Sequence, residues 1–492
     1  MKKHCLLLFC LICIPLMGQS TYKPDWESID KRPVPAWFEN AKFGIFIHWG
    51  LYSVPAWSPK GTYSEWYKYW LDKKTLMGNG NFTGTEIYDY HRKMYGEDFT
   101  YADFAPMFKA LSYDPEEWVD LFEHSGAKYV VLTTKHHDGF ALWPSREASI
   151  SYGRPWNSME IGAHRDLVGE YVNALRKTDI KVGCYFSLRE WDNPLYNKET
   201  MDLFYERHWF PQLQDLVNRY KPDLIWADGP DQINDKQWQA ERTLAWLYSE
   251  SPVKDSIVVN DRWANNTGKK HGDYYTREYS NTNSSYNKPW EECRGIGLSF
   301  GYNQNEDLGD YTSPKALILT LVNIVSQGGN LLLDIGPNAN GKIPPIMQER
   351  LLQIGKWLKV NGEAIYGTRA WGNFCQWSKG SKEWKSKEKH YVSGDAILKQ
   401  TVDPDPGYAV KEVFFTKKGN NVYAILPRYP KNKIVLKDIQ TTGRTKITLL
   451  GSDKKVQWKQ KGNDIEVIMP LLYVDELPCD YAWVLKLEKI SE

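Results

Sequence analysis

The chain has 492 residues, of which 42% are hydrophobic and 25% are charged, and its formal net charge is +1 at pH 7. A chain of this length exceeds one ordinary domain, so we expect at least two. The near-zero charge provides no field that would attract nucleic acid or an anionic membrane surface, so we expect neither as a partner.

The first twenty residues predict an export signal. Lys2 and Lys3 precede an apolar stretch over residues 5–17, and small or polar residues follow at 18–20. The apolar stretch is too short to span a membrane as a helix. We therefore expect a signal peptide over residues 1–20 and no membrane span. The mature protein would be periplasmic or secreted, or lysosomal if the source is eukaryotic.

Residues 40–360 alternate between short apolar runs and amphipathic stretches of helical period. The runs at 43–47, 129–134 and 223–228 are mainly apolar, which is typical of parallel strands buried on both faces. Strands that alternate with helices imply right-handed crossovers in one sheet. We predict an α/β fold in which residues 21–370 form a (β/α)8-type barrel, regular or irregular.

The pattern changes after the predicted barrel. Short segments such as 413–416, 421–426 and 481–486 alternate between apolar and polar residues, and turn residues separate them. This alternation predicts half-buried antiparallel strands. We expect a small C-terminal β-sandwich domain over residues 371–492.

Asp228 is the strongest candidate for chemistry in the chain. It ends the run at 223–228, and Gly229 after it allows a sharp turn in front of the carboxylate. Active sites of α/β barrels lie at the carboxyl ends of the strands, where this side chain would project. A helix-cap or turn aspartate is an equally common reason for Asp after a strand, so this motif alone leaves both interpretations open.

Three histidines also follow apolar runs, namely His48, His136 and His137. Neutral imidazole offers one donor and one acceptor to sugar hydroxyls. A metal site would need a third ligand and supporting carboxylates, and no His-Glu-x-x-His spacing is present. Structural histidines are the remaining alternative. Glu65 and Trp66 add a carboxylate and an aromatic platform for a pyranose ring, so we favour sugar binding and expect no metal or other cofactor.

A glycosidase needs a second carboxyl group across the scissile bond. Glu278, Glu291 and Glu292 lie downstream, in two segments that we interpret as long loops over the barrel mouth. Their spacing in the sequence does not choose among them. Arg262, two residues past the apolar run that ends at Asn260, is a candidate to keep a carboxylate ionised or to bind the sugar. A surface salt bridge is the alternative for this arginine.

Nine segments combine these residues into longer motifs: KFGIFIHWGLYSVPAW (42–57), SEWY (64–67), KHHDGF (135–140), GCYFS (183–187), DLIWADG (223–229), VVNDRW (258–263), GDYYTREY (272–279), PWEECRGIGLSFGYN (289–303) and NLLLDIGPNANGKIP (330–344). In this order they resemble the α-L-fucosidases of glycoside hydrolase family 29. The resemblance extends over about residues 35–370. The part after the barrel resembles the family only in its expected β-sandwich form.

The resemblance assigns roles to individual residues. It implies that Asp228 is the nucleophile and that Glu278, in a Tyr-x-Thr-x-Glu segment, is the general acid and base, with Glu291 in reserve. Arg277 stands where many relatives carry Pro, which could alter this segment. The residues that the resemblance places around fucose are His48, Glu65, Trp66, His136, His137, Tyr185, Trp226 and Arg262.

The expected activity is that of a retaining exo-α-L-fucosidase. Terminal α-L-fucose would be released from fucosylated oligosaccharides or glycoconjugates by double displacement through a covalent fucosyl-enzyme. One alternative is a retaining glycosidase for a related sugar such as α-L-galactose. Another is a secreted carbohydrate-binding protein without turnover, and a third is a metal-dependent hydrolase. The fucosyl linkage and the oligomeric state stay open.

Overall fold

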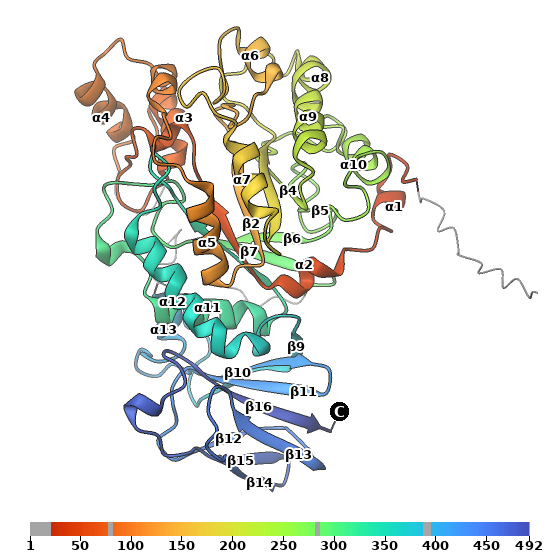
Figure 1. Ribbon diagram of the computed structural model, residues 1–492, viewed down its shortest axis with the longest axis vertical. Helices are drawn as coiled ribbons and strands as arrows, with labels where there is room; N and C mark the ends of the chain where they lie inside the picture. Colours follow the sequence, from red (N-terminus) through yellow and green to blue (C-terminus); the bar gives the residue numbers. More distant parts are fainter. Residues whose placement is uncertain (1–20, 77–81, 281–285, 387–394, 492) are drawn as a thin grey trace, which may run out of the picture.

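The computed structural model describes residues 21–76, 82–280, 286–386 and 395–491. The expected signal peptide at residues 1–20 lies outside this range. Figure 1 shows an upper part, in which helices surround a sheet, and a lower part that consists mainly of the strands β9 to β16. The site residues proposed from the sequence all belong to the upper part.

The upper part contains one parallel sheet of eight strands, in the spatial order β5-β4-β3-β2-β1-β8-β7-β6. Its strands are β1 (Phe43–Ile47), β2 (Tyr129–Lys135), β3 (Lys181–Ser187), β4 (Leu224–Asp228), β5 (Val258–Val259), β6 (Tyr275–Glu278), β7 (Trp290–Gly295) and β8 (Asn330–Ile335). All neighbouring pairs run parallel. The predicted (β/α)8-type barrel is therefore confirmed, in an irregular form.

Helices in the connections cover the outside of this sheet (Figure 1). The longer ones are α4 (Glu86–Tyr95), α5 (Pro115–Ser125), α7 (Leu167–Leu175), α9 (Phe210–Tyr220), α10 (Ala240–Ser249), α11 (Pro314–Ser326) and α12 (Pro345–Asn361). The shorter ones are α1 (Trp26–Ile29), α2 (Ala36–Ala41), α3 (Tyr67–Lys73), α6 (Arg146–Tyr152), α8 (Met201–Phe204) and α13 (Ala396–Lys399). Between β5 and β7, the described residues contain no helix, so this side of the barrel is irregular.

Helix α5 shows how the sequence sets the ends of these helices. The Asp114 side chain accepts hydrogen bonds from the backbone N–H groups of Glu116 and Glu117, which have no partner within the helix. Pro115 occupies the first turn, where a missing N–H has no cost. Gly126 ends the helix in the left-handed conformation, with φ 83°.

The gap between β5 and β6 is joined by hydrogen bonds without a ladder of paired strands. The backbone N–H of Asp273 donates to the carbonyl of Val259 at 3.0 Å, and the Asp273 carboxylate accepts from the N–H of Val259 at 2.9 Å. Further along, Oδ1 of Asp261 accepts from the N–H and the hydroxyl of Thr276, at 2.9 and 2.7 Å. These bonds place the residues after β5, including Arg262, beside β6.

The interpretation of the two downstream segments as long loops is wrong in part, because they contain the parallel strands β6 and β7. The charged residues in these strands interrupt the apolar runs by which a buried strand is recognised in a sequence. Glu291 and Glu292 are both buried on β7. Hydrogen bonds from Tyr129 and Trp226 satisfy Glu291, and an ion pair with Arg294 satisfies Glu292. Paired in this way, carboxylates can occupy the interior of a sheet.

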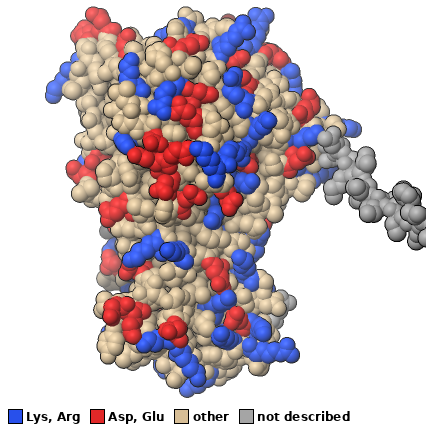
Figure 2. All heavy atoms as spheres, viewed as in Figure 1, with Lys and Arg blue, Asp and Glu red and all other residues tan. Residues whose placement is uncertain are grey.

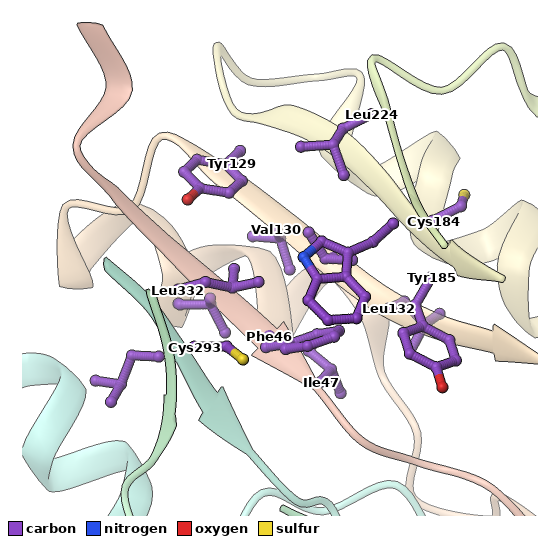
Figure 3. Packing of buried hydrophobic residues seen from close by; sticks show 14 of the residues in the cluster. Phe46, Ile47, Tyr129, Val130, Leu132, Cys184, Tyr185, Leu224, Cys293 and Leu332 are labelled. Carbon is purple, nitrogen blue, oxygen red and sulfur yellow. The ribbon is translucent and has the colours of Figure 1, made fainter. Parts of the chain in front are cut away.

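Aromatic side chains pack inside the barrel below the ends of the strands. Phe46, Tyr185 and Trp226 are buried, and their ring centroids lie 5.0 to 5.9 Å apart. Figure 3 shows the rings of Phe46 and Tyr185, which come from the different strands β1 and β3, in this group. Close packing of this kind leaves little freedom to the strand ends that carry the site.

The lower part consists of two antiparallel sheets, with the orders β13-β16-β11-β10-β9 and β12-β15-β14. Its strands are β9 (Arg369–Trp377), β10 (Lys411–Lys418), β11 (Asn421–Leu426), β12 (Lys433–Leu436), β13 (Thr441–Leu449), β14 (Gln457–Lys461), β15 (Asp464–Ile468) and β16 (Trp483–Ile490). They surround a second apolar core, which confirms the predicted antiparallel β part. The expected domain boundary after residue 370 falls within β9 and stays a prediction.

The surface carries both signs of charge. On the face drawn in Figure 2, Lys and Arg are interspersed with Asp and Glu over both parts of the molecule. Among the described residues, no helix combines the length and the apolar character needed to cross a membrane.

Candidate active site

Asp228 ends β4, and side chains from neighbouring strand ends hold its carboxylate. Oδ1 accepts a hydrogen bond from Nη1 of Arg262 at 3.0 Å, and Oδ2 accepts one from the hydroxyl of Tyr185 at 3.1 Å. Nε2 of His137 lies 3.6 Å from the same Oδ2 atom. The Asp228 side chain is still 20% exposed. The carboxylate is therefore oriented by the protein and reachable from the carboxyl end of the sheet.

Two guanidinium groups favour the ionised form of Asp228. Burial alone would raise the pKa of this carboxyl group, but Arg262 and Arg189 outweigh burial and hold the pKa below its ordinary value. Arg189 follows β3. Its Nη1 atom lies 2.9 Å from Oδ1 of Asp231, and its guanidinium carbon lies 5.2 Å from the ring centroid of Trp66. An ionised carboxylate at a strand end is suited to nucleophilic attack.

Gly229 makes this arrangement of side chains possible. Its φ is 76°, a left-handed conformation that glycine adopts without a steric penalty. A Cβ atom at this position would lie 2.7 Å from Nε of Arg189 and 2.8 Å from Cε1 of His137. The absence of a side chain therefore lets Arg189 and His137 approach the backbone directly behind Asp228.

Glu278 ends β6 and shares Arg262 with Asp228. Nη2 of Arg262 lies 3.4 Å from Oε2 of Glu278, and the hydroxyl of Tyr63 donates to Oε1 at 3.0 Å. Nε of Arg262 donates to Oγ1 of Thr276 at 2.9 Å, which fixes the plane of the guanidinium group. The Glu278 side chain is 32% exposed. One arginine thus contacts two carboxylates at the same edge of the sheet.

Glu291, the reserve candidate for acid and base, lies inside the barrel. Its Oε1 accepts a hydrogen bond from Nε1 of Trp226 at 2.8 Å, and its Oε2 accepts one from the hydroxyl of Tyr129 at 2.6 Å. The residue is fully buried, and burial raises its pKa to about 7. Both oxygens are therefore occupied by groups of the barrel interior, whereas Glu278 is open to solvent.

Two of the three histidines are fixed through Nδ1. Nδ1 of His48 lies 2.5 Å from Oδ1 of Asp334 on β8, and Nδ1 of His137 lies 2.5 Å from Oγ of Ser187 on β3. The ring of His48 also stacks on Phe300, with the centroids 5.0 Å apart. Nδ1 is thus occupied in both rings, and Nε2 of His48 is left to bind a ligand. Nε2 of His137 lies 3.5 Å from the Tyr185 hydroxyl and 3.6 Å from Oδ2 of Asp228.

His136 differs from the other two histidines, because its buried Nδ1 atom has no hydrogen-bond partner within the described structure. Its ring stacks on Tyr185 at a centroid distance of 5.6 Å. Burial lowers the pKa of His136 to about 3 and holds the pKa values of His48 and His137 well below their ordinary value. All three rings are therefore neutral at physiological pH, the form that offers both a donor and an acceptor.

Glu65 and Trp66 lie on a turn of 3₁₀ helix after β1 (Ser64–Trp66). Oε2 of Glu65 accepts hydrogen bonds from the N–H of Gly301 at 2.9 Å and from the hydroxyl of Ser299 at 3.3 Å, while the buried Oε1 has no partner in the described structure. Burial raises the pKa of Glu65 to about 7. Trp66 is partly buried and lies edge-on to His137 at a centroid distance of 5.8 Å.

The fold brings most of the predicted site residues to one end of the sheet. Trp226 differs from the others because its indole N–H points to Glu291 inside the barrel rather than toward the end of the sheet. Its ring lies under Arg262, 4.6 Å from the guanidinium carbon. Within the described parts of the chain, no three His, Cys, Asp or Glu side chains are grouped as metal ligands would be.

Five residues at the site were not predicted from the sequence: Tyr63, Arg189, Trp191, Phe300 and Asp334. Asp334 is near the end of an apolar run, and Arg189 and Trp191 closely follow another, so the pattern that identified Asp228 was also available for them. Tyr63 and Phe300 lie in irregular segments, and no sequence pattern distinguishes them from ordinary core aromatics.

Comparison with known proteins gives consistent matches over nearly the whole chain. The sequence profile of the alpha-L-fucosidase family matches residues 12–363, and that of the alpha-L-fucosidase C-terminal domain matches residues 408–488. The chain is 43% identical to the tissue alpha-L-fucosidase of Homo sapiens, over 96% of this chain and 92% of that one. It is similar in structure to a Thermotoga maritima alpha-fucosidase in complex with fucose, with TM-score 0.73 and 35% identity, covering 95% of this chain and 100% of that one.

Proposed function

The chain belongs to the alpha-L-fucosidase family and is a glycoside hydrolase that acts on fucosides, and we propose that it does so through a covalent intermediate on Asp228. The observation that supports this most directly is the position of Arg262. Its guanidinium group contacts Asp228 at 3.0 Å and Glu278 at 3.4 Å, so two carboxylates lie around the same arginine at the carboxyl ends of the strands. A retaining glycosidase needs such a pair, roughly 5–5.5 Å apart.

In the first step, Asp228 attacks the anomeric carbon of the fucosyl group. The bond between that carbon and the glycosidic oxygen breaks, and Glu278 gives its proton to the departing oxygen. The ionised state of Asp228, which Arg262 and Arg189 favour, supplies the electron pair. The exposed position of Glu278 suits a group that must reach a leaving sugar and then water.

In the second step, Glu278 removes a proton from water, and the resulting oxygen attacks the same carbon. The ester bond to Asp228 breaks, which restores the carboxylate and releases fucose with its original anomeric configuration. The hydroxyl of Tyr185, which donates to Oδ2 of Asp228, stabilises the negative charge that returns to this carboxylate. Because protons are exchanged only with Glu278 and water, the cycle needs no cofactor.

The neutral histidines and Glu65 bind the hydroxyl groups of the fucosyl ring. Nε2 of His48 and the unpartnered Nδ1 of His136 are ring nitrogens that a ligand can pair. Nε2 of His137 lies between the Tyr185 hydroxyl and Asp228, next to the reacting carboxylate. The unpartnered Oε1 of Glu65 adds a further polar atom. A buried polar atom without a partner is costly, so these atoms favour a bound ligand that supplies one. Aromatic rings such as Trp66 and Phe300 can contact the apolar face and methyl group of fucose.

The substrates are fucosylated glycans, and we propose that fucose is removed from their ends. We also propose that residues 1–20 direct export of the chain, in agreement with the apolar stretch that precedes the described structure. A related sugar such as α-L-galactose remains the alternative substrate, because it exchanges only the methyl group for a hydroxymethyl group. Aryl glycosides of both sugars, compared by kcat/KM, distinguish the two.

Trapping of the intermediate tests the assignment of Asp228. A 2-fluoro-fucosyl reagent with a good leaving group slows the second step and should leave one fucosyl label per chain, which peptide mapping should place on Asp228. Asp228→Gly should lose turnover and regain part of it with azide, giving a fucosyl azide of inverted configuration. A label on another residue would overturn the assignment. Folded protein without any turnover of fucosides would support the carbohydrate-binding alternative.

A further inference from the structure

A group of buried polar side chains lies behind the active site, where the ends of β2 and β3 meet. Lys135 ends β2, directly before His136, and Glu190 follows β3 between Arg189 and Trp191. The side chains of Lys135 and Glu190 are 0% exposed. Neither residue has a part in the proposed reaction. Because burying two charges costs free energy, stability alone does not explain why the pair is present.

Both members of the pair have further hydrogen-bond partners. Nζ of Lys135 lies 2.5 Å from Oε1 of Glu190 and donates to Oε1 of Gln212 at 2.9 Å. Nε2 of His208 lies 2.7 Å from Oε1 of Glu190, and Nδ2 of Asn193 donates to Oε2 at 2.7 Å. Burial alone would raise the pKa of Glu190, but His208 and Lys135 hold it at about 2, so the carboxylate is ionised.

The segment that carries Glu190 also contacts the site. The backbone N–H of Trp191 donates to the carbonyl of His137 at 2.9 Å, and the Trp191 ring lies 5.3 Å from that of His137 and 5.5 Å from that of Trp66. Arg189, on the other side of Glu190, lies over Trp66 and favours the ionised form of Asp228. Residues 188–193 therefore face substrate-binding groups on one side and the buried pair on the other.

We propose that the Lys135–Glu190 ion pair is a positioning element of the active site, which holds residues 188–193 against the end of β2 and so sets where His137 and Trp191 meet the fucosyl group. This inference rests on the proposed function. A buried ion pair contributes little net stability compared with apolar residues of the same volume, but its bonds have fixed directions. Apolar side chains would fill the same space without fixing where the two strand ends lie relative to each other.

Replacement of both members separates positioning from stability. Lys135→Met or Glu190→Leu alone leaves one buried charge without its partner, so each should lower Tm by more than about 5 °C. The double variant leaves neither charge without its partner, so its Tm should lie above those of the single variants, although Gln212, Asn193 and His208 each lose a hydrogen-bond partner. Its kcat/KM for an aryl fucoside should nevertheless stay about 10- to 100-fold lower, because the substrate-binding groups are misplaced.

Two further measurements identify positioning as the cause. Hydrogen exchange of peptides spanning residues 186–196 should be faster in the double variant, because the bond from Trp191 to His137 is weakened. The inhibition constant of free fucose should rise, because its binding groups are no longer held in place. A double variant with unchanged exchange and unchanged kcat/KM would overturn the proposal, since the pair would then be only structural.

A milder variant keeps the proposal testable if the others do not fold. Gln212→Met retains both charges and removes the amide that orients Lys135 and also donates to Oγ of Ser145 at 2.9 Å. It should fold and show a smaller loss of kcat/KM, with a rise in the fucose inhibition constant. An unchanged inhibition constant would contradict the proposal. The matched control is the exposed pair Lys177–Glu116, 2.5 Å apart with side chains 65% and 58% exposed, replaced by Met and Leu. This control should leave all three readouts unchanged.

The two proposals can fail separately. Fucoside hydrolysis by the unchanged protein, and labelling of its Asp228, test the proposed function. The ratio of each variant to the unchanged protein tests the ion pair. If Asp228 is labelled in the unchanged protein while the double variant is fully active, only the positioning role is wrong.

Discussion

Nδ1 of His48 lies 2.5 Å from Oδ1 of Asp334, a contact between the end of β1 and the neighbouring end of β8. Both side chains are buried, and Phe300 stacks on the histidine ring. A contact this short holds one proton between the two atoms. The imidazole is therefore fixed in its plane, and Nε2 is the nitrogen that remains for a sugar hydroxyl.

Replacement of Asp334 should therefore act on the binding of fucose through His48. Asp334→Ala removes the partner of Nδ1 and should lower kcat/KM for aryl fucosides by about 10- to 100-fold, equivalent to about 1–3 kcal/mol. Asp334→Asn has a similar shape and still offers a hydrogen bond, so its loss should be smaller. The measurement is the inhibition constant of fucose together with kcat/KM. Equal losses in both variants would show that the carboxylate itself is required, because a neutral partner of the same shape would then not replace it.

The acidic limb of the pH profile should depend on Arg262. Because Arg262 and Arg189 lower the pKa of Asp228, the nucleophile stays ionised down to a pH below the ordinary aspartate range, and activity is lost only as pH falls through that lowered pKa. Arg262→Met removes the larger of the two influences, so the acidic limb of kcat/KM should move to higher pH. Arg189→Met should move it in the same direction by less.

The histidines should not contribute to the profile in the mildly acidic range. The pKa of His136 is about 3, and those of His48 and His137 also lie well below their ordinary value, so none of these rings gains a proton in the mildly acidic range. A limb that stays in place when Arg262 is replaced would mean that a group other than Asp228 sets it. The profile should be recorded with a substrate whose leaving group needs little protonation, so that Glu278 does not obscure the result.

The sequence predicts the parts of the site that end apolar runs. His48, His136, His137 and Asp228 all stand where a strand stops, and the fold class follows from the same runs. The identity of the sugar and the roles of single residues came instead from the resemblance to a family. Pattern alone left Asp228 undecided between a nucleophile and a turn residue.

Other parts of the fold and site depend on contacts that a single sequence does not contain. β6 and β7 contain charged residues and do not follow an apolar pattern, and only the buried partners of Glu291 and Glu292 explain how β7 fits in a sheet. Likewise, Tyr63 contacts Glu278 across a separation of 215 residues. The choice between Glu278 and Glu291 for acid and base stays a prediction, which the following substitutions test.

Replacement of Glu278 and Glu291 should give different kinetic signatures. Without Glu278 the leaving oxygen receives no proton, so Glu278→Ala should lower kcat/KM by about 100-fold or more for natural fucosides and far less for substrates with a good leaving group. Glu291→Ala leaves the indole of Trp226 and the hydroxyl of Tyr129 without partners. It should lower the free energy of unfolding by about 2–4 kcal/mol and affect all substrates alike. The leaving-group pattern in Glu291→Ala instead would reverse the assignment.

Substitution of Gly229 should show how closely Arg189 and His137 must approach Asp228. Gly229→Ala places a methyl group 2.7 Å from Nε of Arg189 and 2.8 Å from Cε1 of His137, at a φ of 76°. The crowding should displace both side chains and lower kcat/KM by about 100-fold, because small displacements at a reacting centre have effects of that size. Asp228 should still be labelled by the 2-fluoro-fucosyl reagent, but more slowly. The rate of labelling is the measurement that checks this.

Gly153 provides the matched control for this substitution. It also has a left-handed φ, 61°, but a Cβ there meets no atom within 4 Å. Gly153→Ala should therefore carry only the backbone penalty, about 1 kcal/mol of unfolding free energy, and keep its activity. If both variants lost activity equally, backbone strain would explain the result. If neither did, Arg189 and His137 would have room to move, and close approach to Gly229 would have no part in the reaction.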